Sequence, residues 1–143
     1  MKNSIAGLEI KVLTTLPDRN EVYALYLEGG WWKEEERAYI NLIDEVIKNS
    51  FAFAGAFVDG KLIGMGRVLS DGFSDAYIQD VIVSQKYRGQ GVGKLIMQAI
   101  LEHLKQKGVA WIGLIAQPGS VEFYKSLGFT IMEDHTPMVM KIR

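Results

Sequence analysis

The pattern of apolar and polar positions divides the 143-residue chain into strand-like and helix-like segments. Branched residues over 8–13 predict a first strand, and Pro17-Asp18 marks the start of a helix that ends at Gly29-Gly30. A second helix is predicted from one continuous apolar face, whose members are Tyr39, Leu42, Ile43, Val46 and Ile47. The first third of the chain therefore predicts one strand followed by two helices.

Three strands are predicted to follow. Segments 51–58 and 61–69 flank Asp59-Gly60, which is a strong signal for a two-residue hairpin turn. Asp71-Gly72 is a second turn and leads into a strand over 76–83. Because both connections are short, these three strands are expected to be sequential and antiparallel.

The pattern changes after Arg88. A long amphipathic helix that ends at Gly108 is indicated by an apolar face made of Val92, Leu95, Ile96, Ala99, Ile100 and Leu104. An apolar strand over 109–116 comes next. A strand, a long helix and another strand form a crossover unit, so this strand is predicted to run parallel to 76–83.

The last part of the chain reads as a short helix over 120–127, ended by Gly128, and two strands over 129–132 and 138–142. The predicted fold is α/β (α+β), with a mixed, mostly antiparallel sheet of about six to seven strands, one parallel crossover pair and about four flanking helices. One domain over 1–143 is expected. Alternating Met138, Met140 and Ile142 could pair with another subunit in a homodimer, and a core role explains them equally well.

Composition and net charge argue against several classes of function. The net charge of −1, from 16 basic and 17 acidic residues, argues against nucleic acid as a partner. The chain has no cysteine and no histidine with a metal-ligand neighbour, so neither a disulfide nor a metal site is expected. Met1–Gly7 lacks the apolar run of a signal peptide, and no segment approaches the roughly 18 apolar residues of a membrane span. A cytoplasmic protein without a membrane partner is the expectation.

The most informative segment is the loop from Arg88 to Lys94, Arg-Gly-Gln-Gly-Val-Gly-Lys, between a strand and the long helix. Glycines there let the backbone approach a ligand, and a helix start adds unpaired N–H donors and a partial positive charge. Lys86, Arg88 and Lys94 also gather at this end, where cations are unfavourable by a few tenths of a kcal/mol each unless an anion is bound. The loop therefore predicts a local phosphate site.

Two common phosphate loops do not match. The nucleoside-triphosphate loop needs a glycine where Arg88 stands and Ser or Thr where Leu95 stands. The dinucleotide fingerprint, counted from Gly89 and Gly91, needs a third glycine where Lys94 stands. Both classes are excluded.

The chain resembles the GNAT superfamily of acetyl-CoA-dependent N-acetyltransferases. Arg88, Gly91 and Gly93 match its signature of Gln or Arg, two residues, Gly, one residue, and Gly or Ala. Phe123-Tyr124 followed by Gly128-Phe129 matches a second family element. The order of elements fits over nearly the whole chain, with the first 50 residues as the weakest part. A purely structural glycine turn is the alternative.

The resemblance implies acetyl-CoA as co-substrate, with its pyrophosphate on main-chain N–H groups of the loop and its pantetheine arm along the strand 81–83. Tyr124 is implied to be catalytic as well as a cofactor contact, although its spacing with Leu127 also suits a core aromatic residue. The implied cofactor-binding residues are Val81, Ile82, Val83, Arg88, Gly89, Gln90, Gly91, Val92, Gly93, Lys94, Gln117, Ser120, Phe123 and Tyr124. Gln117 stands where relatives often have Asn, and Ser120 is also expected to cap its helix.

Transfer of an acetyl group from a thioester to an amine requires two proton transfers. A thiol with a pKa of about 8.5 is a stronger acid than tyrosine at about 10, so full proton transfer from Tyr124 to the leaving thiolate would cost about 2 kcal/mol. Tyr124 should thus act mainly as a hydrogen-bond donor. For the amine, relatives often carry Glu-Asp where this chain has Gln79-Asp80. Asp80 is then the nearest carboxylate that could accept the proton, although strand alternation predicts that it points away from the acceptor. Asp80 could equally serve as a structural partner for a basic group. If the acceptor is an aromatic amine, no strong base is needed.

The acceptor is expected to be the primary amine of a small molecule, attacking directly in a ternary complex. Trp31 and Trp32, with Gln79, are candidate substrate-binding residues, although tryptophans in such loops more often cover the core. The glutamates at 34–36 form either a solvated helix start or a cation-attracting group. Alternative functions are acetylation of a protein lysine or N-terminus, and acyl-CoA binding without transfer.

Overall fold

The computed structural model describes residues 5–142, so residues 1–4 of the Met1–Gly7 segment and Arg143 lie outside the described part. The chain forms two compact units, of which the first ends at Gly113 and the second begins at Leu114. The first unit contains the sheet and three α-helices, and the second contains a single short α-helix among the described residues. One domain over 1–143 stays a prediction.

The first unit is built on a five-stranded sheet in the order β1-β2-β3-β4-β5. Its strands are β1 (Leu8–Val12), β2 (Ala52–Val58), β3 (Lys61–Ser70), β4 (Asp75–Val83) and β5 (Trp111–Gly113). The first four strands are antiparallel neighbours, and β5 runs parallel to β4. Asp59 and Gly60 both have positive φ (51° and 80°), as a primed two-residue hairpin turn requires. The predictions that 51–58, 61–69 and 76–83 form sequential antiparallel strands, and that the next strand runs parallel to the last of them, are confirmed.

Helices α1 (Arg19–Glu28), α2 (Leu42–Lys48) and α3 (Val92–Gln106) surround this sheet. Asp18 caps α1, since its side chain accepts a hydrogen bond from the Asn20 amide at 2.8 Å. The prediction that one helical face runs from Tyr39 to Ile47 is wrong at its start. Tyr39 ends a separate 3₁₀ helix, η1 (Glu34–Tyr39), and is 61% exposed. A 3₁₀ helix has three residues per turn, so the α-helical spacing does not carry across the junction.

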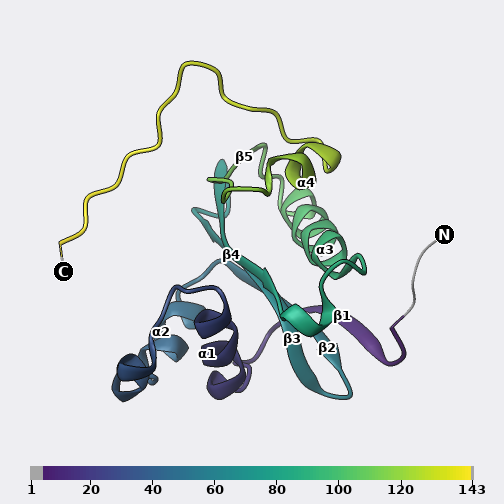
Figure 1. The fold of residues 1–143 in the computed structure, drawn as a ribbon. Helices are drawn as coiled ribbons and strands as arrows, with labels where there is room; N and C mark the ends of the chain where they lie inside the picture. Colours follow the sequence, from purple (N-terminus) through teal and green to yellow (C-terminus); the bar gives the residue numbers. More distant parts are fainter. Residues whose placement is uncertain (1–4, 143) are drawn as a thin grey trace. The chain divides into compact units, whose positions relative to one another are not determined.

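Helices α1 and α2 lie on one face of the sheet and α3 lies on the other (Figure 1). The core under α1 and α2 is formed by Val22, Tyr23, Leu25, Tyr26, Ile43, Ile47, Phe53, Leu62, Met65 and Ile82. On the other face, α3 comes close to β3 at Gly64 and Gly66. A Cβ atom on these glycines would lie 3.0 Å from the terminal methyl groups of Ile96 and Ile100 respectively. The glycines in β3 therefore set how near α3 lies to the sheet.

The second unit contains α4 (Val121–Ser126) and no strand within its described residues, 114–142. The predicted strands over 129–132 and 138–142 are thus wrong, and β5 is shorter than the predicted 109–116. A strand needs a neighbour to complete its backbone hydrogen bonds, and neither segment takes part in a ladder. Consequently the sheet has five strands, fewer than the six to seven expected, while its mixed character with one parallel pair is confirmed.

Candidate functional site

The predicted phosphate loop connects β4 to α3 through a short 3₁₀ helix, η2 (Gln85–Tyr87). Gly89 and Gly91 have positive φ of 75° and 87°, and Gly91 is the N-cap of α3. Such angles are accessible to glycine at little cost and are unfavourable for other residues. Space is open on the side where each would carry a Cβ atom, since no atom lies within 4 Å of that position. The loop therefore follows a path that depends on glycine and leaves its backbone accessible.

The N–H groups of this loop are free to bind an anion. In the described part of the chain, the amides from Gly89 to Lys94 donate to no protein acceptor, and the first amide of α3 with such a bond is that of Leu95, to the Gly91 carbonyl. No side chain caps the helix. Consecutive free amides at the start of a 15-residue helix form a concave set of donors with a positive dipole behind them. A diphosphate fits this arrangement.

The charges at the loop also fit an anion. Lys86, Arg88 and Lys94 form no salt bridge among the described residues, and the first turn of α3 contains no carboxylate. Arg88 is oriented by its own strand, because its Nε donates to the Val83 carbonyl at 2.7 Å. These cations therefore add to the helix dipole without being neutralised by the protein.

The strand that precedes the loop has a free edge. β4 pairs with β5 only at Asp75, Ala76 and Tyr77, so within residues 5–142 the remainder of that edge, from Ile78 to Val83, has no neighbouring strand. Residues 78–83 span about 17 to 20 Å at strand spacing. The Val81 carbonyl thus faces this free edge and is presented to an extended ligand, whereas the main-chain groups of Ile82 face Met65 in β3, because the register continues to the hydrogen bond from the Ser84 amide to the Ile63 carbonyl. The Val83 carbonyl, on the free edge as well, is already occupied by Arg88.

A β-bulge in β4 changes the direction of Asp80. Gln79 pairs with Arg67 and Ile82 pairs with Met65, so Asp80 and Val81 together lie opposite the single residue Gly66. Asp80 takes up the extra residue with a φ of 56°. Simple alternation would place Gln79 and Asp80 on opposite faces of the sheet, but the bulge brings both side chains into contact with Arg67.

Asp80 belongs to a polar network that the sequence did not reveal. Its Oδ2 accepts hydrogen bonds from the Tyr26 hydroxyl at 3.0 Å and from Arg67 Nε at 2.5 Å. Arg67 also donates to Gln79 Oε1 at 3.0 Å and to Ser50 Oγ at 3.3 Å. Burial, and next the negative charge of Asp80, raises the pKa of Tyr26 well above its ordinary value, so the phenol remains a donor. Arg67, a charged residue in the middle of the largely apolar strand β3, was the one signal in the sequence for this network.

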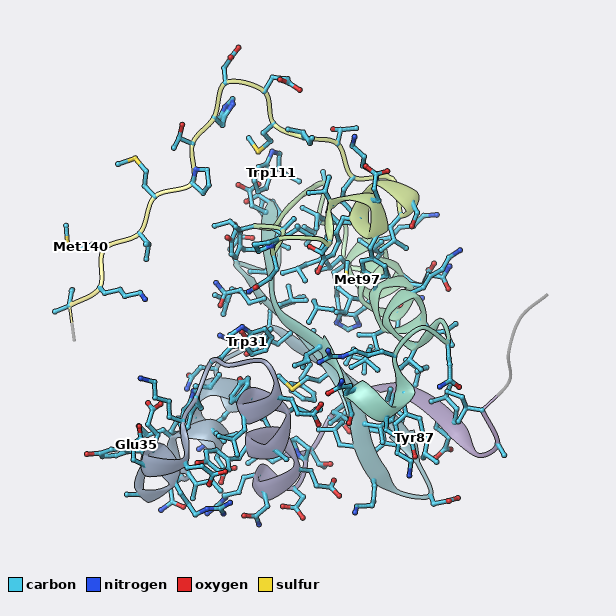
Figure 2. The ribbon with its side chains drawn as sticks, in the orientation of Figure 1. Trp31, Glu35, Tyr87, Met97, Trp111 and Met140 are labelled. Atoms are coloured by element: carbon cyan, nitrogen blue, oxygen red, sulfur yellow. The ribbon has the colours of Figure 1, made fainter. Side chains whose placement is uncertain are left out.

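Trp31 and Trp32 pack around the same tyrosine. Both are half-buried against the α1–α2 core; Trp32 stacks on Tyr26 at 5.8 Å between ring centroids, and Trp31 meets it edge-on at the same distance. Figure 2 shows Trp31 on the side of the helices that faces β4, whereas Glu35 points away from the sheet. The two tryptophans therefore hold Tyr26 in place, and their role as substrate-binding residues stays a prediction.

The second unit holds the other candidate residues. Tyr124 lies in α4 with its ring edge-on to Phe123 and to Phe129, at centroid distances of 5.0 and 5.9 Å. Burial raises its pKa above that of free tyrosine. Ser120 is the N-cap residue of α4, but its hydroxyl donates back to the Gln117 carbonyl at 2.7 Å instead of capping an amide. The tight turn over Gln117–Ser120, with Gly119 at a φ of 86°, explains this difference.

Neither a metal-binding cluster nor a membrane-spanning helix occurs within the described residues. No group of three or more His, Cys, Asp or Glu side chains could hold a metal ion in residues 5–142. In the same range, each helix is too short or too polar to cross a membrane.

A mixed sheet whose open strand leads through a glycine loop into the start of a long helix defines an α/β protein with a turn whose free amides suit an anion. The acetyltransferase (GNAT) family profile matches residues 16–129. A probable acetyltransferase from meticillin-resistant Staphylococcus aureus is 30% identical, with a TM-score of 0.75 over 93% of this chain and 99% of that one. The chain belongs to the GNAT acetyltransferase family.

Two plant relatives are also similar. Serotonin N-acetyltransferase 2, chloroplastic, from Oryza sativa is 36% identical over 134 residues, which is 94% of this chain and 62% of that protein. Histone acetyltransferase TAP1 from Glycine max is 44% identical over 123 residues, 78% of this chain and 52% of that protein. The chain thus spans a little over half the length of these two curated relatives.

Proposed function

We propose that this protein is an N-acetyltransferase that transfers the acetyl group of acetyl-CoA to the primary amine of a small molecule. The observation that carries the proposal is the run of free amides from Gly89 to Lys94 at the start of α3, beside the unpaired edge of β4. The amides and the cations Arg88 and Lys94 would hold the pyrophosphate. The Val81 backbone would bind the pantetheine arm as an added strand does.

Acetyl transfer joins the amine nitrogen to the acetyl carbon and releases the thiolate of CoA. Tyr124 would donate a hydrogen bond to that sulfur. Because burial raises the pKa of Tyr124, complete proton transfer would cost more than the about 2 kcal/mol expected from unperturbed pKa values. Tyr124 therefore acts in this proposal as a donor that stabilises the leaving sulfur, with Gln117, Ser120 and Phe123 as further contacts.

Asp80 would accept the proton that an alkylammonium must lose before it can attack. Gln79 cannot do so, since an amide is not a base at neutral pH. A small amine is favoured by the rice relative, which matches 94% of this chain and is named for serotonin. The soybean relative, named for histone, favours a protein lysine as the second candidate. In both cases the acceptor is an amine.

The test combines turnover with binding. Acetyl-CoA is incubated with a panel that contains benzylamine, tryptamine, spermidine and a histone tail peptide, and thiol release is measured. Calorimetry with CoA is run in parallel. Turnover of a small amine supports the proposal, and turnover of the peptide alone favours the second candidate. CoA binding with no turnover of any acceptor would instead indicate a non-catalytic acyl-CoA-binding protein.

A further inference from the structure

The bulge in β4 places two consecutive polar side chains on the face of the sheet that carries α1 and α2. Gln79 keeps its ordinary position opposite Arg67, and Asp80, as the extra residue, joins it there. Val81 then returns to the α3 face, where its side chain lies near Gly66. A left-handed residue other than glycine costs about 1 kcal/mol or more, less for Asp than for most residues. Asp80 keeps this unfavourable backbone conformation at the point where Tyr26 and Arg67 donate hydrogen bonds to its side chain.

Both hydrogen bonds to Asp80 end on the same oxygen. Tyr26 and Arg67 donate to Oδ2, while within the described part of the chain no protein group donates to Oδ1. Two donors on one oxygen fix the rotation of the carboxylate and leave the second oxygen available. Asp80 is also only partly buried, with 22% of its side chain exposed. The side chain that carries the free oxygen is therefore partly open to solvent.

The donors themselves are held tightly. Tyr26 is 3% exposed, and its ring is fixed between Trp31 and Trp32. The Arg67 side chain is 13% exposed and is fixed at its other nitrogens by Ser50 and Gln79. Neither donor can follow the carboxylate if it moves, so the position of Asp80 is set by groups that are buried and preorganised.

Gln79 offers no competing base. A guanidinium has donors and no acceptor, so the amide atom that faces Arg67 must be the oxygen, and the NH₂ group points away. Residue 79 thus presents donors to any ligand on this face. Asp80 Oδ1 is the oxygen of this network that remains able to take a proton.

We propose that Tyr26 and Arg67 are positioning residues that hold Asp80 so that Oδ1 takes a proton from the attacking ammonium. This inference rests on the proposed function. The ammonium gives one proton to Oδ1, the neutral nitrogen forms the C–N bond as the C–S bond breaks, and the second proton leaves nitrogen as the thiolate becomes the thiol. Asp80 then releases its proton to solvent, which balances the reaction.

The test uses two acceptors of the same size. Benzylamine is charged at neutral pH and must lose a proton first, whereas phenylhydrazine is largely uncharged and needs no such step. Tyr26→Phe should lower kcat/KM for benzylamine about tenfold, the effect of one hydrogen bond to a charged group, and change that for phenylhydrazine less than about twofold. Arg67→Met should show a larger selective loss, and Arg67→Lys should restore part of it.

Tyr23→Phe is the matched control. Tyr23 lies on the same helix, is 1% exposed, and donates to the Lys33 carbonyl at 2.8 Å, but it does not touch Asp80. Its loss should destabilise the fold and leave the ratio of the two kcat/KM values unchanged. CoA affinity should be the same in all variants.

Three results would overturn the inference alone. They are equal losses for both acceptors in Tyr26→Phe, no loss for either acceptor, and wild-type turnover of phenylhydrazine without turnover of benzylamine. Wild-type protein that binds CoA and acetylates neither acceptor, nor any other amine, would overturn the proposed function and this inference with it. A selective loss for benzylamine with normal CoA binding would support both.

Discussion

Replacing Gly91 by alanine should weaken CoA binding beyond what the loss of fold stability accounts for. Gly91 has a φ of 87°, and a Cβ atom there would meet no atom within 4 Å. The cost to stability is therefore conformational and not steric, about 1 to 2 kcal/mol for a left-handed alanine. For a chain of this size that corresponds to a fall in Tm of about 3 to 6 °C.

The same helix offers a control at its other end. Gly108 has a φ of 81° and likewise has open space at its Cβ position. It follows the C-cap of α3, remote from the amides of the loop. Gly108→Ala should therefore lose about the same 1 to 2 kcal/mol of unfolding free energy without affecting the phosphate site.

Urea unfolding measures the stability of both variants, and calorimetry measures their affinity for CoA. Gly91→Ala should bind CoA at least about tenfold more weakly than Gly108→Ala, because a methyl group and a relaxed backbone would disturb a hydrogen bond to a charged phosphate worth about 1.5 to 3 kcal/mol. Equal CoA affinity in two equally destabilised variants would refute the assignment of the phosphate site.

Three other perturbations test separate parts of the chain. Tyr124→Phe should lower kcat about ten- to a hundredfold while calorimetry shows unchanged CoA affinity; an unchanged kcat would remove Tyr124 from the mechanism. Ile96→Ala, at a fully buried position of α3, should cost about 2 to 5 kcal/mol in urea unfolding, and a loss below 1 kcal/mol would contradict the close packing on Gly64. Hydrogen bonds from the Ser74 side chain, and then from the amides of Ser74 and Phe73, hold the pKa of Asp71 well below its ordinary value. Since a lowered pKa stabilises the fold above the unfolded value of about 3.9, Asp71→Ala should be less stable than wild type at pH 7, and the difference should shrink as pH falls below about 4. Unfolding curves that differ equally at pH 7 and pH 3 would contradict this.

The sequence predicted what depends on local signals. Asp59-Gly60 fixes its hairpin through backbone conformation alone, and the apolar face of α3 repeats at a clear helical spacing. The position of the glycine loop between β4 and α3 was also predictable, because its glycines and cations are adjacent in the chain. Each of these features needs only neighbouring residues.

Features that depend on the exact register of two strands, or on residues far apart in the sequence, were not predictable. The contact between Arg67 and Asp80 requires the register of β3 with β4, including a bulge that no residue type marks. Tyr26 comes from a helix 54 positions earlier in the chain than Asp80. At the C-terminus, the alternation over 138–142 resembles a strand, but alternation does not supply the neighbouring strand that a ladder requires.

The bulge has a consequence for which changes of sequence β4 can accept. With Asp80 deleted, Gln79 would still face Arg67, Val81 would lie opposite Gly66, and Ile82 would keep its place opposite Met65. The aspartate is therefore a supernumerary residue inserted into an otherwise regular ladder. The Asp80 carboxylate can therefore be gained or lost by adding or removing a single codon, without a change in the register of the residues on either side.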